Sequence, residues 1–178
     1  WWGRVGLITI EAVLFASLIT SYFYLRFYAP EWPLGGIPKP DLLLPSIGAV
    51  MLLLSSGPMF WADASIKKGN VRNLMIGLAG SFVLGVVFLV LKTIEYSGHD
   101  YTWATNAYGS IVWTIIGFHS AHVLAVLLKV AVVFTAAAQG YFSDERNLGV
   151  RINGLYWHFV VVVWIPLFFT LYLSHYVL

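Results

Sequence analysis

Five apolar stretches, each long enough to cross a lipid bilayer, constrain the fold of this chain more than any other feature. They cover residues 5–28, 42–61, 74–94, 108–138 and 155–176. A hydrocarbon core about 30 Å thick requires roughly 20 apolar residues in an α-helix. The polar breaks between these stretches are too short to form a separate soluble domain. The sequence therefore predicts an all-α integral membrane bundle of five transmembrane helices, with residues 1–178 forming a single transmembrane domain.

The composition supports the same class. Hydrophobic residues make up 60% of the chain and charged residues only 10%, whereas charged residues make up about 25% of an average soluble domain. The net charge of +2 is small and scattered, which argues against a nucleic-acid partner. The chain has no cysteine, so disulfides, thiolate metal sites and a cysteine nucleophile are excluded.

The distribution of positive charge predicts the orientation, because cytoplasmic loops carry an excess of lysine and arginine. With the N-terminus inside, the inner side carries six basic residues, Arg4, Lys67, Lys68, Arg72, Arg146 and Arg151. The outer side carries three, Arg26, Lys39 and Lys92. The count favours an inside N-terminus and an outside C-terminus. We expect Lys129, late in the fourth stretch, to extend towards the inner interface.

A carboxyl group lies inside the first apolar stretch, in the segment LITIEAVLFASL. Glu11 must face protein or a polar cavity there, because an isolated carboxylate in hydrocarbon is costly. Ionisable residues within membrane spans are candidate functional residues. Glu11 is therefore predicted to handle protons or to contact lipid head groups, and a purely packing role is the alternative.

Three histidines occupy the last two stretches. His119 and His122, in GFHSAHVL, are three residues apart and share a helix face. His158 follows Trp157 in the fifth stretch. The depths estimated along each helix place Glu11, His122 and His158 in the inner half of the membrane, so we expect them to form a buried polar cluster with one another.

These histidines are not expected to bind haem or metal. A bis-histidine haem needs two rings that face each other at matching depth, and His122 and His158 differ in depth by about 6 Å at 1.5 Å per residue. No carboxylate-rich ligand set accompanies them. We therefore predict no metal ligand in this chain.

Other features suggest packing or interfaces. Gly77, Ser81 and Gly85 form a stripe of small residues that permits close helix approach, either inside the bundle or at a subunit interface. Trp157 falls near a predicted membrane interface, and Glu95 is expected at the outer interface, paired with Lys92 or a loop donor. Pro58 and Pro166 are predicted to kink their helices.

The motifs GFHSAHV and YWHFVVVVW together resemble the signature pair of subunit III of haem-copper terminal oxidases, the cytochrome c oxidase subunit 3 family. EAVLFASLITSYFYLRF, LLLSSG and KTIEY fall in the expected order, and the resemblance covers nearly the whole chain. The chain resembles the five-helix form, which lacks the first two of seven helices. One departure is Val161, where members of the family commonly carry aspartate.

The resemblance implies a subunit without a redox centre. Haem and copper are carried by subunits I and II, which reduce oxygen and pump protons. Subunit III contacts subunit I, holds phospholipid and supports proton uptake. Glu11 matches the buried, carbodiimide-sensitive carboxyl position of the family, and His119, His122 and His158 match its histidines by motif. The five-helix form favours a bacterial inner membrane over a mitochondrial one.

Two alternatives remain open at this point. A subunit III-like accessory protein of a nitric oxide reductase would share the same motifs, and only its catalytic partner would distinguish it. An independent transporter or proton channel is disfavoured, because the sequence has no internal repeat and no broken helices in matching positions.

Overall fold

The computed structural model describes residues 2–177, apart from the side chains of residues 2 and 4, so the Arg4 charge used for the orientation lies outside the described side chains. The helices are α1 (Trp2–Tyr28), α2 (Leu43–Leu54), α3 (Ser56–Ile66), α4 (Val71–Ser97), α5 (Ala107–Ala138), α6 (Leu148–Phe168) and α7 (Ser174–Val177). Short 3-10 and π-helical turns, η1 (Leu34–Gly36) and η2 (Phe169–Leu173), complete the list. Because α2 runs into α3, and α6 continues through η2 into α7, the described residues form five membrane-length helices, as predicted.

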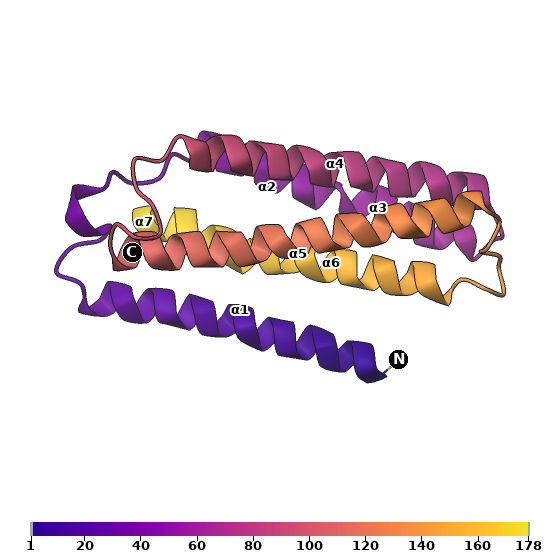
Figure 1. Cartoon of the computed structure of the whole chain (residues 1–178), viewed down its shortest axis with the longest axis horizontal. Coiled ribbons are helices and arrows are strands. Elements are labelled where there is room, and N and C mark those ends of the chain that lie inside the picture. Colours follow the sequence, from indigo (N-terminus) through magenta and orange to yellow (C-terminus); the bar gives the residue numbers. More distant parts are fainter. Residues whose placement is uncertain (1, 178) are drawn as a thin grey trace.

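The helices run roughly along one long axis (Figure 1). The N-terminal end of α1 lies at the same end of the bundle as the α3–α4 and α5–α6 turns, and the C-terminus lies at the opposite end. α1 is set along one side and is the least buried span. In its most apolar stretch 11% of the residues are buried, against 50% in the last span. The side chains of α1 are therefore the most accessible to lipid or to another subunit.

Local sequence signals set several helix ends. The side chains of Asn70 and Asn106 each accept a hydrogen bond from a backbone N–H three residues later, which caps α4 and α5. Gly69 and Gly140 follow α3 and α5 with φ of 70° and 72°. This left-handed conformation is accessible to glycine without steric cost. The α3–α4 turn is consequently tight, and it brings these two helices side by side.

The α-helix of span two is interrupted at Ser55, between α2 and α3. Pro58 has no backbone N–H, so it cannot donate a hydrogen bond to the carbonyl oxygen of Leu54, four residues earlier. Its ring also crowds that carbonyl group. Ser55 joins three elements at this point. Its carbonyl accepts a hydrogen bond of 2.9 Å from Ser81 of α4, and its hydroxyl accepts one of 3.0 Å from the Trp157 indole of α6.

Trp157 and the small-residue stripe both pack inside the bundle. Trp157 is 2% exposed and lies in the core, because Ser55 supplies an acceptor for its N–H and Gly85 leaves room for its ring. A Cβ on Gly85 would lie 2.9 Å from that ring. Ser81 is also fully buried. The stripe of Gly77, Ser81 and Gly85 therefore packs against helices of this chain and is not a subunit interface.

Gly77 is the tightest point of this stripe. A Cβ there would lie 2.6 Å from the Pro58 carbonyl oxygen and 2.8 Å from the Ala62 Cβ. Both neighbours belong to α3, so the two helices would have to move apart.

We predict that Gly77→Ala lowers the free energy of unfolding, because overpacking costs about 1–3 kcal/mol. Gly117→Ala on α5 is the matched control, since a Cβ there meets nothing within 4 Å and it gains the same helix propensity. Unfolding of both variants in detergent micelles measures the difference. Equal stability of the two variants would contradict the close contact between α3 and α4.

Candidate functional site

Glu11 of α1 is held by a tyrosine of α6. The hydroxyl of Tyr156 donates to the Glu11 carboxylate, contacting both of its oxygens. The Glu11 side chain is 16% exposed, and Tyr156 as a whole is 7% exposed. The contact satisfies a carboxyl group that hydrocarbon cannot solvate. It also ties the least buried helix to the last span.

His122 of α5 completes this arrangement. Its Nε2 atom lies 3.7 Å from Oε1 of Glu11, and its Nδ1 atom lies 2.7 Å from the carbonyl oxygen of Phe118. A carbonyl oxygen can only accept, so Nδ1 must carry a proton. In the neutral ring, Nε2 therefore presents a lone pair towards the carboxyl group.

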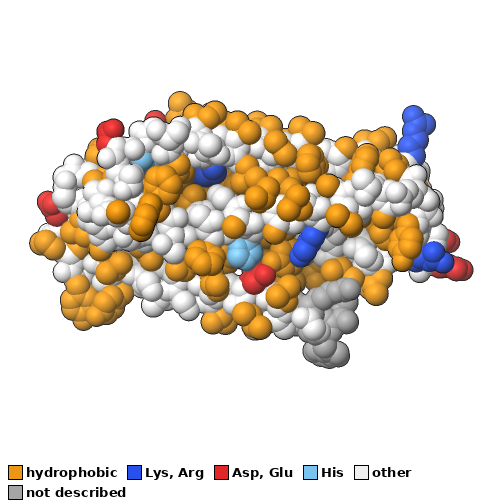
Figure 2. All heavy atoms as spheres, in the orientation of Figure 1, with side chains coloured by type: hydrophobic (Ala, Val, Ile, Leu, Met, Phe, Trp, Pro, Cys, Tyr) orange, Lys and Arg blue, Asp and Glu red, His pale blue; other side chains and the backbone are white. Residues whose placement is uncertain are grey.

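The pair can consequently hold one proton in two ways. Either the Glu11 carboxyl is protonated beside a neutral His122, or a carboxylate faces a His122 that is protonated on both nitrogens. The Tyr156 hydroxyl can donate to the carboxyl group in both states. We call Glu11, His122 and Tyr156 the carboxyl site. Figure 2 shows a histidine, an acidic and a basic side chain close together on an otherwise largely hydrophobic face of the molecule.

His119 lies deeper and connects helices. It is 1% exposed, and its Nε2–H donates to the Val160 carbonyl of α6 over 3.2 Å. The ring lies against Trp164, with centroids 4.6 Å apart, and Phe15 lies between His119 and His122. His119 therefore joins α5 to α6 and has no direct contact with the carboxyl site.

His158 does not join the cluster, contrary to our expectation. Its ring stacks on Phe60 of α3, with centroids 3.8 Å apart. Tyr156 and His158 are two residues apart on one helix, which separates their directions by about 200°. Since Tyr156 faces α1, His158 faces away from it. Estimates of depth alone missed this separation, because they ignored rotation about the helix axis.

Within residues 2–177 the structure groups no three His, Asp or Glu side chains at spacings that would hold a metal ion. Val161 occupies the position where the family commonly carries aspartate, and it is 4% exposed. It lines a void of about 10 Å³ with the apolar residues Leu52, Val123, Val126, Trp157 and Val160. The apolar valine side chain suits this apolar lining, which offers no side-chain partner for a second buried acid.

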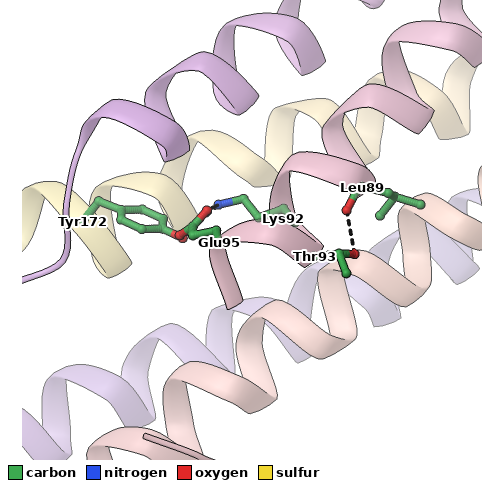
Figure 3. Close-up of polar contacts among 5 residues, drawn as sticks. All are labelled: Leu89, Lys92, Thr93, Glu95 and Tyr172. Carbon is green, nitrogen blue, oxygen red and sulfur yellow. Dashed lines mark hydrogen bonds and ion pairs between the residues drawn. The ribbon is translucent and has the colours of Figure 1, made fainter. Parts of the chain in front are cut away.

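A second polar cluster lies towards the other end of the bundle. Figure 3 shows Lys92 and Glu95 of α4 pointing towards Tyr172 of η2. Nζ of Lys92 lies 2.7 Å from Glu95 Oε2 and 2.8 Å from the Tyr172 hydroxyl, which donates to Glu95 Oε1 over 2.6 Å. Lys92 also lies over the Trp164 ring, at 4.7 Å from its centroid.

The predicted pairing of Glu95 with Lys92 is confirmed, and the pair lies inside the bundle. The Lys92 and Glu95 side chains are 3% and 9% exposed. The π-helical turn after Pro166 brings Tyr172 onto the pair, and such turns add a residue that changes which face a side chain takes. A buried ion pair of this kind requires its further hydrogen bonds to be satisfied, and Tyr172 meets that need.

Sequence reasoning missed two contributing residues, Tyr156 and Tyr172. Tyr156 stands inside the quoted YWHFV motif, and helical rotation from His158 is the signal that could have identified it. Tyr172 gave no such signal, because the π-helical turn changes its register. Lys129, which was expected to extend towards the inner interface, lies with its Nζ 3.9 Å from the centroid of the Tyr156 ring.

These observations define a five-span α-helical membrane protein with a carboxyl–histidine–tyrosine site on its most accessible helix. The model of the family described as cytochrome c oxidase subunit III matches residues 1–176. The chain belongs to that family.

Curated relatives support the same assignment. The cytochrome c oxidase subunit 3 of Synechocystis sp. is 34% identical over 172 residues, which cover 96% of this chain and 74% of the relative. The protein of that name from Thermostichus vulcanus is 31% identical over 172 residues, covering 96% of this chain and 85% of the relative. A subunit 3 from Mycosarcoma maydis is 31% identical over 176 residues, with coverage of 96% and 64%.

We predict that Lys92→Met lowers the free energy of unfolding by about 3–5 kcal/mol, because it leaves the buried Glu95 carboxylate without its cation. Lys67→Met is the control. Lys67 pairs with Asp63 at 2.6 Å but is 51% exposed, and such surface pairs contribute about 0–1 kcal/mol. The double variant Lys92→Met/Glu95→Gln should recover part of the loss. Unfolding in mixed micelles measures all three, and equal losses for the two single variants would contradict a sealed ion pair.

Proposed function

We propose that this chain serves as the non-redox subunit III of a haem-copper oxygen reductase in a bacterial inner membrane, with its N-terminus inside and its C-terminus outside. In this proposal it contacts subunit I directly and assembles with subunit II. Those two subunits carry the haem and copper that reduce oxygen. The chain stabilises the catalytic subunit, holds phospholipid and supports proton uptake. Family membership supports this assignment.

The observation that carries the proton-related role is the carboxyl site. Glu11 and His122 together can hold a proton at Nε2 or at the carboxyl group, and Tyr156 keeps the carboxyl group in place. The site lies on α1, the span with the most accessible side chains. A proton held there can exchange with a neighbouring subunit or with the membrane surface more readily than one held at the sealed Lys92–Glu95 pair.

His119 and His158 take supporting roles in this proposal. His119 joins α5 to α6 and holds the helix that carries His122. His158 stacks on α3 and helps to place the helix that carries Tyr156. Both act on the carboxyl site through the backbone of their helices.

The assignment predicts that the tagged chain, isolated from its native membrane in mild detergent, brings down a catalytic subunit that shows haem absorbance. The spectrum of the partner separates the remaining alternatives, because an oxygen reductase and a nitric oxide reductase differ in their metal centres. Isolation of the chain without any haem-containing partner would contradict the assignment.

We further predict that Glu11→Ala leaves the haem spectra and the initial rate of oxygen consumption close to those of the native complex. Inactivation during turnover should become severalfold faster, because protons reach the catalytic subunit more slowly. Tyr156→Phe should give a weaker effect in the same direction, since the carboxyl group remains but loses its donor. Glu145→Gln, an exposed loop acid, is the control. Turnover-dependent inactivation that is unchanged in Glu11→Ala would refute the role of the carboxyl site.

A further inference from the structure

His158 of α6 is a polar side chain on an outer surface of the bundle. Its ring stacks on Phe60 of α3. Within residues 2–177, neither of its ring nitrogens has a hydrogen-bond partner or a carboxylate within ion-pair distance. These nitrogens are not sealed inside the bundle, in contrast to the unpaired Nδ1 atom of His119. His158 is half-buried, and its polar atoms reach the surface.

The depth of His158 leaves water and lipid head groups out of reach. Arg151, an exposed basic residue of α6, lies seven residues earlier, which is about 10 Å along the helix axis. Lys67, also exposed, lies seven residues after Phe60, at the end of α3. Because basic side chains of this kind extend to the edge of the hydrocarbon core, the imidazole lies well inside the core. Its donor and its acceptor both need a partner from protein there.

The surface around His158 leaves room for another helix. Two exposed apolar residues, Val162 and Ile165, follow His158 at intervals of four and three residues and share its side of α6. On α3, Phe60 is exposed near Gly57, where a Cβ would meet nothing within 4 Å. A small residue on a helix surface permits the close approach of a second helix. We call Gly57, Phe60, His158, Val162 and Ile165 the His158 face.

The His158 face lies away from the carboxyl site. Tyr156 and His158 point about 200° apart on α6, and Tyr156 donates to Glu11 of α1. A helix bound to the His158 face therefore leaves the carboxyl site accessible. The last span is otherwise the most buried of the five, so packing within this chain does not account for a polar residue on its surface.

The charges at one end of the face select the kind of partner. Asp63 pairs with Lys67, and among the described residues no carboxylate lies within ion-pair distance of Arg151. A second copy of this chain, docked through a two-fold axis, would bring the same cations against each other. Like charges disfavour such a pair. A different chain with an acidic residue at this end is complementary.

We propose that the His158 face binds a transmembrane helix of a different subunit, and that this helix hydrogen-bonds the His158 ring through an acidic, amide or hydroxyl side chain. The partner helix carries an acidic residue about two turns from that side chain, where it meets Arg151. Val162 and Ile165 pack against its apolar residues, and Gly57 lets it approach α3. This inference rests on the proposed function, in which the chain is one subunit of a complex, and deepens it by assigning a docking face.

Photo-crosslinking in the native membrane tests the position of the face. Val162 is replaced with p-benzoylphenylalanine in the tagged chain, and so, in a separate variant, is Val83 of α4, which is similarly exposed. The Val83 variant measures the background of chance encounters. We expect position 162 to react with a different polypeptide of the complex, at a yield severalfold above that background. Mass spectrometry should place the crosslinked segment in a transmembrane helix with a polar residue near the contact.

Substitution of His158 tests the hydrogen bond. His158→Leu should raise the dissociation constant for the partner subunit in detergent about tenfold, the loss expected for one hydrogen bond between membrane helices. His158→Gln should retain most of the affinity, because its amide can both donate and accept. Native mass spectrometry across a detergent titration measures the bound fraction for each variant of the complex.

Three outcomes would overturn the proposal. Crosslinking of position 162 to lipid alone would place the face against acyl chains. Crosslinking to a second copy of this chain would exclude a different subunit as the occupant. Equal dissociation constants for the native chain and His158→Leu would show a contact in which the imidazole has no part. In each case, co-isolation of the native chain with a haem-containing subunit leaves the proposed function intact, whereas a native chain without such a partner removes the proposed function itself.

Discussion

The scarcity of water in the hydrocarbon core is the constraint on which the rest of this structure depends. A polar group there must find its partner within the protein. Ser55, Glu11 and Lys92 each have such a contact with a different element, Ser55 with α4, Glu11 with α6 and Lys92 with η2. Satisfying these groups sets the rotation and depth of the helices relative to one another, which apolar contacts alone would leave less specific.

The three polar contacts differ in strength and exposure, and the difference suggests a division of roles. The Lys92–Glu95–Tyr172 cluster is sealed and connects α4 to η2. Ser55 connects span two to α4 and α6. The carboxyl site holds α1, which has few buried residues. The first two contacts hold the core of the bundle together, and the third leaves a titratable group near the surface where a partner can reach it.

The number of spans could be predicted, because span length depends on local sequence. The pairing of Glu95 with Lys92 was also predictable, since residues three apart on a helix are neighbours. The approach of Glu11 to His122 followed from their depths. The position of His158 could not be derived from depth, because its direction about the helix axis depends on which neighbour Tyr156 faces. The small-residue stripe was compatible with two partners, and only the contact of Gly77 with Pro58 and Ala62 decided between them.

By itself, the sequence determined the class of protein, the number of spans and the residues that cannot remain unpaired in lipid. Apolar length and the cost of burying charge act on each segment separately, so no knowledge of neighbours was needed. Only the tertiary structure decided which polar groups satisfy one another. Tyr156 meets Glu11, His158 turns to Phe60, and Tyr172 meets Glu95, because helix rotation and the π-helical turn arise from the packing of all five spans together.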